Sequence, residues 1–197
     1  MTSDLAQSQS DMRAGYCSGG AGVLASALAW LAAAIATLQL SPQQAVWVLF
    51  VGGMAIHPAG VLFCKVLGRS GGHSKGNPLG SLAGATTMWL IFSLPLAFAA
   101  SMQRIEWFFP AMLLVIGGRY LTFHTLFGLR VYWLLGLALA AAGWVLGMSL
   151  TTPTLAAFVG SGIEAMFAVY IIISDRRSSH LQESVLTELA EGAGVRQ

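Results

Sequence analysis

The sequence predicts an all-α integral membrane protein, a polytopic helical bundle of about six transmembrane helices. Hydrophobic residues make up 56% of the 197 residues and charged residues only 9%, whereas a soluble protein carries about 25% charged residues. The mean hydropathy is +0.71. Several apolar runs reach the roughly 20 residues that a helix needs to cross a bilayer. These runs are too long and continuous for the strands of a membrane barrel, so helices are expected.

The predicted transmembrane domain covers residues 20–175 and lies between two short tails. The N-terminal tail, residues 1–19, is polar, and we expect its first part to be frayed. The C-terminal tail, residues 176–197, has apolar residues at a spacing that suits a short amphipathic helix. The six transmembrane helices are predicted at residues 21–40, 45–67, 78–100, 107–127, 130–150 and 154–174.

Basic residues determine the predicted orientation. In the six-helix arrangement, Arg104 lies on one side of the membrane, and Arg119 lies inside a helix. All the other Lys and Arg residues fall on the opposite side, which the positive-inside rule assigns to the cytoplasm. We therefore predict a multi-pass protein of the inner (plasma) membrane with both termini in the cytoplasm. The residues on the cytoplasmic side are Arg13, Lys65, Arg69, Lys75, Arg130, Arg176, Arg177 and Arg196.

Two charged residues lie deep inside predicted helices. Arg119 is nine residues from Gly128, and Glu164 is ten residues from Ser174, the inner ends of their helices. At 1.5 Å per residue, both lie about 14 to 15 Å above the cytoplasmic boundary. A charge at the centre of a helix costs about 2.5 to 3.5 kcal/mol on insertion scales. The matched depths predict that the two side chains pair and share this cost.

Other polar groups are expected in the same layer of the membrane. His57 is about nine residues from the inner end of its helix, and Thr86 and Thr87 are eight to nine residues into theirs. We therefore predict a candidate binding layer that consists of Arg119, Glu164, His57, Thr86 and Thr87.

Tyr120 and His124 are secondary candidates, because they share a helix face one turn apart and can hydrogen-bond. Haem ligation by His57 and His124 is disfavoured, since these histidines differ in depth by about four residues. Cys17 and Cys64 form no CxxC, and no His lies at metal-finger spacing from them. We expect no cofactor and no metal.

Two interpretations of the polar layer stay open. A buried Arg–Glu pair can simply lock two helices together, but ionisable groups inside a membrane are functional candidates by default. The enzyme motifs HExxH and GxSxG are absent, which argues against an enzyme. The Gly-rich segment 68–77 lacks the GxxxxGK[ST] pattern of a phosphate-binding loop. We expect no nucleic-acid partner.

Stripes of small residues mark close helix packing in the first and fifth predicted helices. Such stripes let helix backbones approach each other, either within one chain or in a homo-oligomer. The stripes therefore allow a second copy of the chain as a partner. The other expected partners are the lipid bilayer and, from the polar layer, a small anionic or proton-coupled substrate. The stripes consist of Ala25, Ala29, Ala32 and Ala36, and of Gly136, Ala140, Gly143 and Gly147.

Three segments carry a resemblance to a known family: WFFPAMLLVIGGRYLTF at residues 107–123, GGMAIHP at residues 52–58 and KGNPL at residues 75–79. They resemble a family of uncharacterised bacterial multi-pass integral membrane proteins of unknown function. The resemblance covers the chain from about Arg13 to Ser174. It implies a bacterial inner-membrane location, and it carries over no functional residue.

The leading functional hypothesis is a small transporter or permease-like protein with a buried polar site at Arg119 and Glu164. In this hypothesis Arg119 holds an anionic group and Glu164 exchanges a proton. The alternative is a non-transporting structural, sensory or accessory subunit whose polar layer only fixes helix packing.

Overall fold

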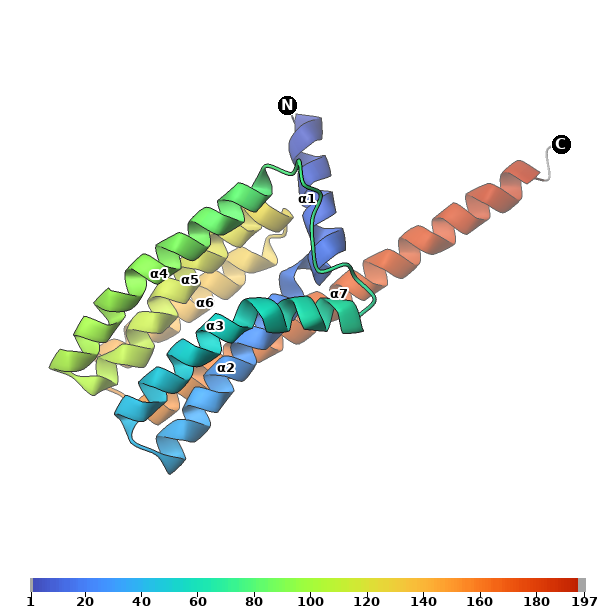
Figure 1. Ribbon diagram of the computed structural model, residues 1–197. Helices are drawn as coiled ribbons and strands as arrows, with labels where there is room; N and C mark the ends of the chain where they lie inside the picture. Colours follow the sequence, from blue (N-terminus) through green and yellow to red (C-terminus); the bar gives the residue numbers. More distant parts are fainter. Residues whose placement is uncertain (1, 195–197) are drawn as a thin grey trace.

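The computed structural model contains every helix that the apolar runs predict, and a further helix at the N-terminus. It describes residues 2–194, with side chains described for residues 4–178. The long helices are α1 (Thr2–Tyr16), α2 (Gly20–Gln39), α3 (Pro42–Val66), α4 (Leu79–Gln103), α5 (Phe108–Phe127), α6 (Val131–Met148) and α7 (Pro153–Gly194), and short 3-10 turns, η1 (Cys17–Gly19) and η2 (Ile105–Trp107), precede α2 and α5 (Figure 1).

Local sequence explains where these helices begin and end. The Ser41 hydroxyl accepts a bond from the Gln44 backbone N–H at 3.2 Å, and the Gln44 side chain accepts one from the Ser41 N–H at 3.0 Å. This capping box, with Pro42 as the first helical residue, starts α3 earlier than the predicted residue 45. At the end of α5, Gly128 adopts a left-handed φ of 69°, which residues with a side chain rarely adopt.

Five of the helices are long and apolar enough to cross a membrane. Within the described residues the first candidate span, Asp4–Gln39, runs through α1, η1 and α2. The others are Pro42–Val66, Leu79–Gln103, Val131–Met148 and Pro153–Ser178. The predicted all-α multi-pass fold is thereby confirmed, while the side of the membrane on which the termini lie stays a prediction.

The remaining long helix, α5, does not reach the same apolar content. Helix α5 is as long as α2, with 20 residues each, but Arg119 and His124 lower its mean hydropathy. It packs against α4, α6 and α7, so much of its surface faces protein rather than lipid. A helix that is surrounded by neighbours can hold polar groups that a lipid-facing helix cannot.

The bundle consists of two groups of helices that lie side by side (Figure 1). Helix α2 packs against α3 and α7, and α5 packs against α4 and α6, while contacts of α7 with α5 and α6 join the groups. Aromatic rings reinforce this junction at one end. Phe50 of α3 lies 5.3 Å from Phe108 of α5 between ring centroids, and Trp30 of α2 lies 6.0 Å from Phe109.

The small-residue stripes are used within the chain. A Cβ atom on Gly117 of α5 would lie 2.7 Å from the Gly136 carbonyl oxygen of α6, and one on Gly143 would lie 2.7 Å from the Pro110 carbonyl oxygen. On the other side of the bundle, a Cβ on Gly52 of α3 would lie 3.0 Å from the Ala29 Cβ of α2. Of the two possibilities left open for the stripes, the structure contains the packing within one chain.

The N-terminal residues form a docked helix where the sequence predicts a frayed tail. The Gln9 side chain donates to the Thr125 carbonyl at 2.9 Å, and Arg13 donates to the Phe127 carbonyl at 2.6 Å. The Asp11 carboxylate accepts a bond from the Asn77 side chain at 2.7 Å. These bonds explain the difference: the first two satisfy carbonyls at the end of α5, which a helix terminus leaves unpaired, and the third joins α1 to the loop before α4.

The C-terminal end of the chain extends the last predicted helix. Helix α7 continues past residue 174 as one helix to Gly194 and leaves the bundle, as Figure 1 shows. The amphipathic pattern predicted for this tail involves side chains from residue 181 onward, which lie outside the described side chains.

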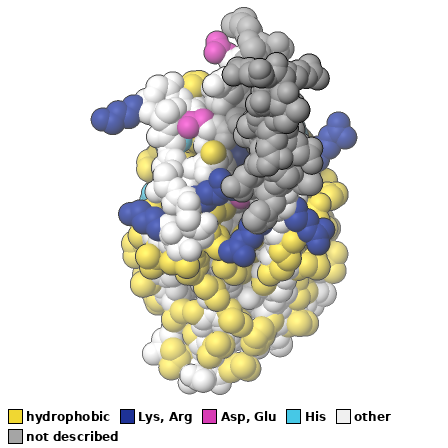
Figure 2. All heavy atoms as spheres, turned by 90° about the vertical axis from the view of Figure 1, so that its right-hand side faces the viewer, with side chains coloured by type: hydrophobic (Ala, Val, Ile, Leu, Met, Phe, Trp, Pro, Cys, Tyr) yellow, Lys and Arg dark blue, Asp and Glu magenta, His cyan; other side chains and the backbone are white. Residues whose placement is uncertain are grey.

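Charged side chains gather at the end of the bundle where α1 lies, above a surface that is mainly hydrophobic (Figure 2). There the Arg69 guanidinium forms an ion pair with the Asp175 carboxylate at 3.1 Å, and the Ser18 hydroxyl donates to the same carboxylate at 2.6 Å. The Tyr132 hydroxyl donates to the Ser18 carbonyl at 2.6 Å. This network ties the turn before α2 to α6, to α7 and to the loop after α3.

The turn η1 has an unusual backbone. Cys17, Ser18 and Gly19 all have positive φ angles, of 52°, 54° and 84°. The left-handed region costs about 1 to 2 kcal/mol for each residue other than glycine, so surrounding contacts must hold Cys17 and Ser18 in place. The hydrogen bonds of Ser18 to α6 and α7 supply such contacts.

The close contact of α5 and α6 predicts different effects for two adjacent glycines. Gly117→Ala should lower the free energy of unfolding by about 1 to 3 kcal/mol, because its Cβ would clash with the backbone of α6. Gly118→Ala is the matched control, since nothing lies within 4 Å of its Cβ position. It should be neutral or stabilise by up to about 1 kcal/mol, the helix propensity gained. Thermal unfolding in detergent measures both, and equal effects would contradict the described interface.

Candidate functional site

Glu164 is the most completely buried charged residue among the described side chains. It lies on α7 with 0% of its surface exposed, and neither carboxyl oxygen has a hydrogen-bond partner. The hydroxyl groups of Ser26 on α2 and Tyr120 on α5 are its polar neighbours, without reaching hydrogen-bond geometry. An ionised carboxylate in such a place costs far more than a neutral carboxyl, because no hydrogen bond replaces the water that it loses on burial.

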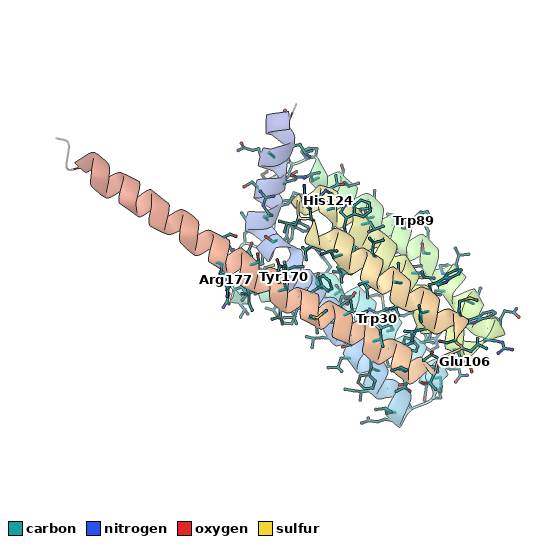
Figure 3. The ribbon with its side chains drawn as sticks, turned by 180° about the vertical axis from the view of Figure 1, so that it is seen from behind. Trp30, Trp89, Glu106, His124, Tyr170 and Arg177 are labelled. Atoms are coloured by element: carbon teal, nitrogen blue, oxygen red, sulfur yellow. The ribbon has the colours of Figure 1, made fainter. Side chains whose placement is uncertain are left out.

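Contacts between α2 and α7 fix the position of Glu164. The Ser161 hydroxyl, one turn before Glu164, donates to the Ala27 carbonyl of α2 at 3.1 Å. Gly160 lies against the Trp30 ring, where a Cβ would approach the ring to 2.9 Å. Trp30 is fully buried, and its indole N–H also lacks a partner. The labels of Figure 3 place Trp30 beside α7 in the interior of the bundle.

Arg119 lies on the other side of α5, towards α4. Its guanidinium donates to the Thr87 hydroxyl at 3.1 Å and lies 5.4 Å from the centroid of the Phe123 ring, within the range of a cation–π contact. Its Nε atom is buried without a partner. A guanidinium has five N–H donors, so most of its hydrogen-bonding capacity remains for another acceptor.

A groove between α4 and α5 opens beside Arg119. It has a volume of about 320 Å³ and is lined by Ala85, Thr86, Trp89, Gly118, Arg119 and Thr122. Trp89, at the edge of the groove, has 65% of its surface exposed and points outward from α4 in Figure 3. The groove therefore opens on the outer surface of the bundle, whereas Glu164 is enclosed inside it.

The predicted pairing of Arg119 with Glu164 is wrong. The guanidinium and the carboxylate are not within the 4.0 Å of an ion pair, and Glu164 meets Tyr120 instead. Consecutive residues of a helix point about 100° apart, so Arg119 and Tyr120 project towards different neighbours of α5. The position of a residue along its helix fixes the depth of its charge in the membrane but not the direction of its side chain.

The other predicted residues fall in different places. Thr87 contacts Arg119 as described, and Thr86 lines the groove while its hydroxyl donates to the Ala83 carbonyl at 2.9 Å. His57 is exposed on α3 and does not join these groups. Tyr120 lies beside Glu164. No hydrogen bond joins Tyr120 and His124 among the described side chains, and the buried Nδ1 of His124 has no partner.

Ser26 and Trp30 belong to the interior site, and the sequence reasoning did not identify them. Both lie on α2, one turn apart, in a segment that reads as an apolar stripe of small residues. The Ser26 hydroxyl, a polar group in the middle of an apolar helix, is the sequence feature that could have indicated this site. For metals, the described residues contain no group of three or more His, Cys, Asp or Glu side chains placed to hold an ion.

A family model matches residues 5–174 of the chain, and its description is a family of unknown function, DUF7010. The expected resemblance to an uncharacterised family is thus confirmed. Nothing among the curated proteins or the solved structures matches the chain.

Double-mutant cycles test the described partner of Arg119. The cycle of Arg119→Met with Thr87→Val should give a coupling energy of about 1 kcal/mol or more, because a hydrogen bond to a charged group is removed once in each single variant. The cycle of Arg119→Met with Glu164→Gln should give a smaller coupling energy. Unfolding free energies in detergent provide both values. A larger coupling energy with Glu164 than with Thr87 would support the predicted ion pair and contradict the described partner.

Proposed function

We propose that this chain, which belongs to the DUF7010 family of unknown function, is a small proton-coupled transporter of the bacterial inner membrane. Its substrate is a small anion. Glu164 binds and releases the coupled proton, and Arg119 contacts the anionic group of the substrate. The two residues act at separate places on α5 and α7.

The observation that carries this proposal is the complete burial of the Glu164 carboxyl without a hydrogen bond or an ion pair. A residue that only fixes helix packing would be paired, because a buried polar group without a partner destabilises the fold. Glu164 has no such partner, although it is fully buried. A proton-carrying carboxyl must be stable both as the neutral acid and as the charged carboxylate. It therefore needs surroundings that differ between two states of the protein.

Ser26 and Tyr120 complete the proton site. Each hydroxyl can donate a hydrogen bond to a carboxylate or accept one from a neutral carboxyl. As neighbours of Glu164 on two different helices, they stabilise the charged form when α2 and α5 move closer to α7. Proton release is thereby coupled to a movement of the helices, which transport requires.

Arg119 supports the anionic character of the substrate. Arginine binds carboxylate and phosphate groups through two parallel N–H donors, and the guanidinium of Arg119 keeps donors free beyond its bond to Thr87. The groove beside it has about 320 Å³, which is at the small end of ligand pockets at roughly 300 to 1,000 Å³. A metabolite-sized anion fits this volume.

One observation favours the rival function of an accessory subunit. Trp89, Phe92 and Leu96 form an exposed apolar stripe on α4, with 65%, 72% and 73% of their surfaces exposed, next to the groove of Arg119. A helix of a partner membrane protein with an acidic residue would satisfy both the stripe and the guanidinium. In that case the chain would bind the partner and move no solute.

Proteoliposomes separate these functions. The purified full chain is reconstituted with a pH-sensitive dye in the lumen, and inward gradients of succinate and of inorganic phosphate are imposed in turn. The lumen should acidify faster than in protein-free liposomes for at least one of these anions. Glu164→Gln should abolish the difference, since the amide cannot exchange a proton at neutral pH.

The controls make the result specific. Glu106→Gln changes an acidic residue in η2, outside the proposed site, and should leave the flux unchanged. Arg119→Gln should reduce the rate for the transported anion. Wild-type liposomes that behave like protein-free ones with both anions, or equal rates in wild type and Glu164→Gln, would overturn the proposed function.

A further inference from the structure

The fold brings together the two cysteines, which lie far apart in the sequence. Helices α2 and α3 cross closely where a Cβ on Gly60 would lie 3.2 Å from the Gly22 Cα. Cys64 follows one turn after Gly60 on α3, and Cys17 precedes α2 at the same end of the crossing. Beyond them, the Gly71 N–H donates to the Gly15 carbonyl at 3.0 Å. The two cysteines therefore lie between the Gly22–Gly60 contact on one side and the Gly15–Gly71 hydrogen bond on the other.

The thiols form a small cluster of their own. Cys17 and Cys64 are 3% and 1% exposed and pack together with Ala21, apart from the main core of the bundle. Each thiol neighbours the other, and both are free cysteines. They account for all the cysteines of the chain, so any disulfide within one chain must join these two residues.

We propose that Cys17 and Cys64 are a redox-active pair that becomes a disulfide by exchange with a small-molecule disulfide. The thiolate of one cysteine attacks a sulfur atom of the reagent and releases one thiol, forming a mixed disulfide. The second cysteine then attacks the mixed disulfide and releases the second thiol. The cysteines lose two electrons and two protons, and the reagent disulfide gains both as two thiols. This proposal is independent of the proposed transport.

The backbone of η1 explains how buried thiols can react. A buried thiol is ordinarily inert, but Cys17 belongs to the turn η1 and packs in one cluster with Cys64. Cys17 and Ser18 are held in the left-handed region, so opening the turn releases backbone strain. It exposes Cys17 first, and the neighbouring Cys64 then lies within reach of the mixed disulfide.

The proposed disulfide would affect the network at this end of the bundle. Ser18, next to Cys17, donates to Asp175, and Arg69, just beyond Cys64, pairs with the same carboxylate. A bond between the cysteines would therefore lock the two chain segments that hold α7 at the point where it leaves the bundle. Oxidation would reduce the opening of η1 and so change the freedom of α7.

Intact-mass spectrometry tests the proposal on the full chain in mild detergent. The folded protein is treated with 4,4′-dithiodipyridine, a small apolar disulfide, and excess reagent is removed. Wild type should lose the mass of two hydrogens and carry no reagent adduct. After unfolding in sodium dodecyl sulfate, it should not react with a maleimide, and reduction should restore both thiols.

Single variants give the matched control. Cys17→Ser and Cys64→Ser each keep one thiol and lack the second cysteine, so each should keep a mixed disulfide with one reagent group. Wild type that carries reagent groups on both cysteines would show that the thiols do not reach each other. Wild type that keeps both thiols unreacted while folded would show that they only fill space. Either result overturns the proposal.

Discussion

The burial of an unpaired carboxyl among three helices is the constraint on which the interpretation of this protein depends. Glu164 can occupy its position because small residues of α7 bring α2 close and because Ser161 bonds to the backbone of α2. Insertion of an ionised group at this depth is costly, and among the described side chains no cation lies within ion-pair distance of Glu164. This cost supports the proposed role of Glu164 as the group that binds and releases a proton, because its charge state would depend on the polar groups around it.

Helix α5 separates this interior group from the second polar site. Tyr120 faces Glu164, while Arg119, the preceding residue, faces Thr87 and the groove beside α4. The same helix packs tightly on α6 through Gly117 and Gly136, so it cannot rotate without disturbing that interface. A movement of α5 and α6 as one unit relative to α2 and α7 would change both polar sites at once. Such a movement would link the two polar sites in the proposed transport.

Much of the fold could be predicted from the sequence, because lipid restricts the chain to helices and each apolar run has the length of a bilayer span. Ser41, Pro42 and Gln44 form a local capping signal for the start of α3, although the apolar run placed that start at residue 45. The docking of α1 could not be predicted, since its polar residues bond to a loop and a helix end that are distant in sequence. In the site, depth followed from counting residues, which is why Arg119 and Glu164 were both identified. Their partners could not be identified, because the rotation of each helix about its axis depends on packing that no single helix encodes.

Infrared spectroscopy of the reconstituted protein at neutral pH shows whether the buried carboxyl of Glu164 holds a proton. The carbonyl stretch of a protonated carboxyl is separate from the bands of ionised carboxylates and reports the state of Glu164 without any knowledge of the substrate. A protonated Glu164 should give such a band in wild type, and the band should be lost in Glu164→Gln and kept in Glu106→Gln. A wild-type spectrum without a protonated carboxyl band, or a band that survives in Glu164→Gln, would show that Glu164 does not hold the proton.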